Sequence, residues 1–131
     1  MRNILKAKII KKFVDIEESI EIEIEGKKIV AFTMSRNRFV VNEGDFYLVE
    51  LSLNEYYKME IKLATENVKD VVQLDGFLYK LNGLYDADKH TIDVGFIIDL
   101  NEFDMFDYGY LHNKYIQMEI GRFDVEILQK M

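Results

Sequence analysis

Acidic and large aromatic side chains are interleaved in one segment of the chain, from Asp99 to Asn113. Aromatic rings are frequent anchors of protein interfaces, and carboxylates beside them can pair with Lys or Arg of a basic partner. In a second interpretation, Phe103, Phe106 and Leu111 close one end of the hydrophobic core while the acids face water. We expect partner binding by the following residues: Asp99, Glu102, Phe103, Asp104, Phe106, Asp107, Tyr108 and Tyr110.

The same segment could supply oxygen ligands for Ca²⁺, but its spacing does not match a calcium loop. In the EF-hand pattern, the third ligand position and the glycine would fall on Phe103 and Asp104. Residues 86–90 begin in a similar way but have Thr91 where the glycine belongs, so a hairpin turn explains them better. We therefore predict no metal site.

Other catalytic chemistries find few candidate residues. The chain has no cysteine, no glycine-rich phosphate loop and no G-x-S-x-G motif, and its two histidines, His90 and His112, each lie beside a polar turn. Paired carboxylates remain, because Glu21, Glu23 and Glu25 share one strand face at intervals of about 7 Å. We expect that face to lie in water, and we predict no enzyme activity and no cofactor.

Charge is distributed unevenly along the chain. Residues 1–65 hold 11 basic and 11 acidic residues, whereas residues 66–131 hold 6 and 13 and so carry the whole net charge of −7. An acidic surface attracts basic partners and repels phosphates, so we predict a basic protein partner and expect nucleic acid to be an unlikely ligand. The neutral half could still form a local basic patch, although we prefer lysines that guard a sheet edge. Its candidate residues are Lys6, Lys8, Lys11, Lys12, Arg36 and Arg38.

The elements that position these residues are predicted to be strands, because apolar residues recur at every second position. After Ser19, residues 20–25 alternate Ile and Glu without interruption, and a tight turn follows at residues 25–27. The alternation changes phase at Gly121, which indicates a bulge or turn. The expected strands cover about 4–14, 19–25, 28–34, 46–53, 56–63, 77–85, 90–100 and the closing region 114–128.

One segment has helical rather than strand spacing. Val68, Val71 and Val72 fall on one helix face, Asn67 could cap the N-terminus, and Gly76 follows the C-terminus. The sequence predicts an all-β, mainly antiparallel domain over residues 1–131, a barrel or strongly coiled sheet of about seven to nine strands with one short helix near 67–74. Strands before and after a central helix resemble the order of an OB-fold barrel.

These features favour a small acidic module that binds a basic protein partner. The alternatives are an OB-like single-stranded nucleic-acid binder and a barrel that carries a small ligand. The chain has no apolar run long enough to span a membrane and no signal-peptide core, so we expect a cytoplasmic protein without membrane contact.

Overall fold

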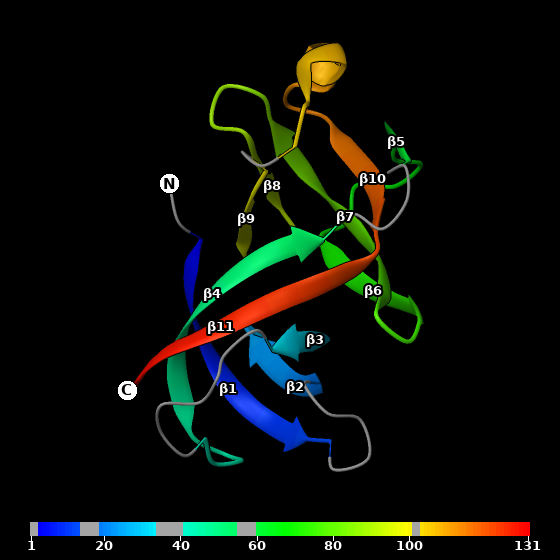
Figure 1. Ribbon diagram of the computed structural model, residues 1–131. Helices are drawn as coiled ribbons and strands as arrows, with labels where there is room; N and C mark the ends of the chain where they lie inside the picture. Colours follow the sequence, from blue (N-terminus) through cyan, green and yellow to red (C-terminus); the bar gives the residue numbers. More distant parts are fainter. Residues whose placement is uncertain (1–2, 14–18, 34–40, 55–59, 101–102) are drawn as a thin grey trace.

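The computed structural model describes residues 3–13, 19–33, 41–54, 60–100 and 103–131, which contain eleven strands and one short 3-10 helix (Figure 1). The predicted all-β class is confirmed. The strands are β1 (Ile4–Lys12), β2 (Ser19–Ile24), β3 (Lys27–Thr33), β4 (Phe46–Asn54), β5 (Ile61–Leu63), β6 (Asp70–Asp75), β7 (Leu78–Asp86), β8 (Thr91–Asp93), β9 (Ile97–Asp99), β10 (Tyr115–Ile120) and β11 (Arg122–Lys130), and the helix is η1 (Phe106–Leu111).

Five of the strands close into a barrel in the order β1-β2-β3-β11-β4, with β4 pairing back to β1. The pair β3 and β11 is parallel, and the other four pairs are antiparallel. Alternation along each strand sends apolar side chains inward, where they fill the barrel. These buried residues are Ala7, Ile9, Ile20, Ile22, Ile24, Ile29, Ala31, Tyr47, Val49, Leu51, Leu53, Phe123, Val125 and Ile127.

The structure confirms one local prediction within the barrel and contradicts another. The tight turn between β2 and β3 is confirmed, since Glu25 and Gly26 both have positive φ (49° and 78°), as a two-residue hairpin turn of this kind requires. β1 is not the edge strand that its lysines suggested. It pairs with β4 along Ile4–Lys8 and with β2 along Lys8–Lys12.

The described residues between β4 and β11 build a second sheet, which lies above the barrel in Figure 1. Its strand order is β5-β10-β7-β8-β9, and β6 pairs with β7 beside β8. We call residues 55–121 the insert, because they interrupt the barrel between two neighbouring strands. Gly121 marks the crossing from the second sheet back to the barrel, and the predicted change of phase there is confirmed.

Tyr79 of β7 joins the two sheets. Its side chain is fully buried, and its hydroxyl accepts a hydrogen bond from the backbone N–H of Val30 on β3 (2.7 Å). Its ring packs edge-on against Phe123 of β11, with 5.2 Å between the ring centroids. One hydrophobic core therefore extends through both sheets.

The predicted helix at 67–74 is wrong. Residues 70–75 form strand β6, which pairs antiparallel with β7 through a turn at Gly76. Valine has a branched Cβ that suits a strand better than a helix, and the neighbouring strand β7 supplies the backbone partners.

Several predicted strands differ in their limits. The strand expected over 90–100 is two short strands, β8 and β9, because Gly95 has a φ of 109° and turns the chain between them. Residues 14–18, 34–40 and 55–59 lie outside the described residues, and with them the loop holding Arg36 and Arg38 and part of the strand expected at 56–63. In the described part of the chain, no helix is long and apolar enough to cross a membrane.

Candidate functional site

The short helix η1 has one buried face and one exposed face. A 3-10 helix repeats every three residues, so Met105, Tyr108 and Leu111 fall on the same side. Met105 and Leu111 are buried, and Tyr108 packs against the core. On the other sides, Phe106 is 90% exposed and Tyr110 is 70% exposed.

Hydrogen bonds fix both ends of this helix. At the start, Oδ1 of Asp104 accepts a hydrogen bond from the backbone N–H of Phe106 (3.0 Å). At the end, the N–H of His112 donates to Gly109 and the N–H of Lys114 donates to Leu111. The helix therefore presents its exposed rings from a fixed backbone.

The structure brings together half of the residues predicted to bind a partner. Asp104, Phe106, Asp107 and Tyr110 are all exposed, and we call these four residues the knob. The other predicted residues lie elsewhere: Phe103 and Tyr108 pack against the core, Asp99 lies on β9, and Glu102 is outside the described residues.

Asp99 has a structural setting of its own. Its backbone N–H donates to Oδ1 of Asn3, and Nδ2 of Asn3 donates to the carbonyl of Ile97. The amide of Asn3 thus pairs with β9 much as a neighbouring strand would, which covers part of the edge of the second sheet.

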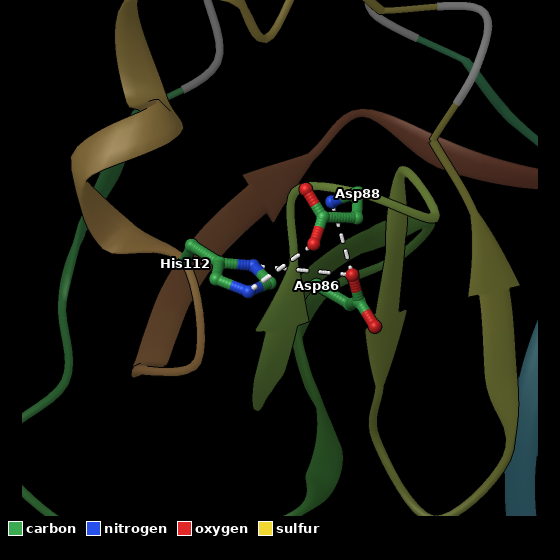
Figure 2. A group of neighbouring side chains, drawn as sticks. All are labelled: Asp86, Asp88 and His112. Carbon is green, nitrogen blue, oxygen red and sulfur yellow. Dashed lines mark hydrogen bonds and ion pairs between the residues drawn. The ribbon is translucent and has the colours of Figure 1, made fainter.

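His112 lies against the turn between β7 and β8, beside two carboxylates (Figure 2). Its Nδ1 accepts a hydrogen bond from the backbone N–H of Ala87 (3.0 Å), and its Nε2 lies 3.6 Å from Oδ2 of Asp88. Oδ1 of Asp86 is 3.9 Å from Nδ1. One potential ligand atom from each of His112, Asp86 and Asp88 lies within 4.8 Å of the others.

The hydrogen bonds of this cluster fit a structural role better than a metal site. In a neutral imidazole, only one of the two ring nitrogens can accept a hydrogen bond. In His112 this nitrogen is Nδ1, which accepts from the backbone N–H of Ala87, so Nε2 carries the proton. Oδ1 of Asp86 accepts hydrogen bonds from the N–H groups of Lys89 and Asp88. These bonds, that from Lys89 most strongly, lower the pKa of Asp86. The cluster holds the turn after β7 against the end of η1.

Two buried polar groups had no signal in the sequence. Asp124 on β11 is 5% exposed, accepts hydrogen bonds from Arg122 and Asn54, and lies outside the barrel core. Asn82 on β7 is 4% exposed and donates to Asp70 (2.7 Å). Both sit at outward positions of their strands, where the alternation predicts solvent exposure.

The net charge follows the two structural parts of the chain. Residues 1–54 and 122–131, which include the barrel strands, contain 11 basic and 11 acidic residues. The insert contains 6 basic and 13 acidic residues, which gives the whole net charge of −7. The knob is therefore part of the acidic half of the molecule.

Residues 3–128 match a family described as "Uncharacterised conserved protein UCP019853". The chain belongs to this family. No curated protein and no solved structure matches the chain. Its function must therefore be inferred from its own residues.

Proposed function

We propose that this protein is a non-enzymatic interaction module whose knob binds a basic protein partner. The exposure of Phe106 and Tyr110 carries the proposal, because the same short helix is anchored by the buried side chains of Met105 and Leu111. Burying a phenylalanine side chain contributes about 1.5–3 kcal/mol, which is available to a partner that covers Phe106. Aromatic residues on a fixed backbone are frequent hot spots of interfaces.

Charge supports a basic partner. Asp104 and Asp107 are exposed beside the two rings, and the insert that holds them has seven more acidic than basic residues. Such a surface speeds the association of basic proteins, and the effect weakens as salt screens the charges.

A pull-down tests the role of the two rings. Immobilised wild-type protein and an immobilised Phe106→Ser/Tyr110→Ser variant are each incubated with cell lysate, and the proteins that they retain are compared. The experiment is done at about 50 mM and about 500 mM salt, between which the screening length falls about threefold. We expect a basic protein to be retained by the wild type at low salt and lost with the double variant. Leu63→Ser is the matched control, since Leu63 is an exposed apolar residue on β5 (56% exposed).

Substitutions of the acids test the charge. Asp107→Lys should weaken retention and reduce its dependence on salt, because Asp107 is exposed. Asp104 is better changed to Asn, which keeps an oxygen to accept the hydrogen bond from Phe106. Retention that is equal for the wild type and the Phe106→Ser/Tyr110→Ser variant would overturn the proposal.

We also infer that the barrel is OB-like. The order β1-β2-β3-β11-β4, in which only β3 and β11 are parallel, supports this inference, although the helix that first suggested it is absent from residues 67–74. OB barrels bind nucleic acids on the face of their second and third strands. Here Glu21 and Glu23 point outward from β2, so that face does not favour a nucleic-acid ligand.

Apolar side chains fill the interior of the barrel, so the alternative of a small-ligand carrier receives no support. The absence of cysteine is consistent with a cytoplasmic location, and fractionation of cells that express the tagged protein would test it.

A further inference from the structure

We propose that the outer face of β1 and β4 binds single-stranded nucleic acid. The binding residues are Lys6, Lys8, Lys11, Phe13 and Phe46, which we call the lysine stripe. This surface belongs to the barrel, whereas the knob belongs to the insert. The two proposals can therefore fail independently.

A β-bulge aligns the three lysines. Lys6 and Lys8 point outward because Ala7 and Ile9 fill the barrel. Regular alternation would turn Lys11 inward, but the register shifts between Ile9 and Lys11. Lys11 then pairs with the outward residue Glu21, so all three lysines share one face.

The ammonium groups lie over aromatic rings. Nζ of Lys6 and Nζ of Lys8 are 4.7 Å and 6.0 Å from the centroid of the Phe46 ring, and Nζ of Lys11 is 5.3 Å from that of Phe13. Phe46 is nonetheless 43% exposed. Its ring is thus partly accessible beside two positive charges.

The lysines also remain available for an anionic ligand. Lys8 and Lys11 lie directly across from Glu23 and Glu21, but within the described residues none of the three lysines forms an ion pair. Their ammonium groups are directed to the rings instead. A phosphate can approach them without first displacing a carboxylate.

The spacing and chemistry fit a polynucleotide. Lys6 and Lys8 are two strand residues apart, so their Cα atoms are separated by about 7 Å. This distance is similar to the separation of consecutive phosphates in an extended single strand. Lysines that contact the phosphates, combined with aromatic rings on which bases stack, are the usual components of single-strand binding. The net charge of −7 lies in the insert, and the residues outside it carry no net charge.

Fluorescence anisotropy with a labelled oligothymidine tests the proposal on the full-length protein. Three lysine contacts predict a salt slope of about −2, so a tenfold rise in salt should weaken binding about 100-fold. Lys6→Gln/Lys8→Gln should reduce the slope to about −0.7. Phe46→Leu should weaken binding about 5- to 150-fold at an unchanged slope, because it removes stacking and no charge.

The matched control is Lys62→Gln/Lys89→Gln, which removes two exposed lysines from the insert. It should bind like the wild type if the stripe is the binding surface. Circular dichroism of each variant reports whether it is folded, and the stripe lysines are exposed or half-buried, so their change to Gln should not unfold the chain. The proposal is wrong if the wild type does not bind the oligonucleotide at low salt, or if the control substitutions weaken binding as much as Lys6→Gln/Lys8→Gln. It is also wrong if the protein binds heparin or anionic vesicles but does not bind the oligonucleotide.

Discussion

The hydroxyl of Tyr79 makes a polar contact between the second sheet and the barrel, and its removal should destabilise the protein measurably. Tyr79→Phe keeps the buried ring and its packing on Phe123 but deletes the acceptor for the N–H of Val30. Leaving a donor without its acceptor costs about 1–3 kcal/mol. This bond is only partly buried, so we expect a loss of about 1–2 kcal/mol in the free energy of unfolding.

Urea unfolding followed by circular dichroism measures this loss. The midpoint should fall while the slope m stays constant, because the surface exposed on unfolding does not change. Tyr85→Phe is the matched control: Tyr85 is equally buried, but its hydroxyl makes no hydrogen bond within the described residues. We expect the control to change the free energy by less than about 0.5 kcal/mol. Equal midpoints for Tyr79→Phe and the wild type would refute the role assigned to this bond.

Three further predictions concern stability. Burial raises the pKa of Tyr79 above the 10.0 of an exposed tyrosine, so unfolded chains lose this proton first and stability should fall as pH rises above about 10; in urea titrations that fall should be shallower for Tyr79→Phe. The hydrogen bond from Lys69 lowers the pKa of Asp93 below 3.8, so its contribution is present above that pH and is lost below it, and Asp93→Asn should unfold with a weaker dependence on acid. Gly83→Ala should destabilise by about 3 kcal/mol or more in thermal unfolding, because its Cβ would lie 2.2 Å from the carbonyl oxygen of Asp93, and a Tm within about 2 °C of the wild type would contradict this reasoning.

The strands were predictable from the sequence where one face is buried and the other is not. In β2 the isoleucines are buried and Glu21 and Glu23 point outward, as a period of two requires. The segment 67–74 failed because three valines fit a helix face by spacing and a strand by their branched side chains. The pairing of β6 with β7 decided between them, and pairing is not visible in a short window.

Strand order was less accessible, because it depends on contacts between distant residues. Phe123 of β11 pairs with Ala31 of β3, and no local pattern connects the two. The closed barrel and the insert follow from such pairings. The predicted likeness to an OB barrel began from a helix that the structure replaces with a strand.

The candidate site was predictable in part. The mixture of acids and rings located the segment, but it did not separate inward from outward residues. The spacing of Met105, Tyr108 and Leu111 at intervals of three could have done so, since it matches a 3-10 helix. The contact between His112 and the turn at Asp86 joins residues far apart in sequence and had no such signal.

The place of β11 between β3 and β4 also determines the order in which the chain can fold. The barrel cannot close until the C-terminal strand reaches its two partners, one of which lies near the beginning of the chain. Closing so long a loop is entropically costly and slow. The hairpins of β6, β7, β8 and β9 connect strands that are consecutive in sequence, so we expect them to form earlier. During synthesis, the isoleucine-rich inner faces of β1 to β3 stay exposed until β4 and β11 have been made, because these two strands complete the barrel.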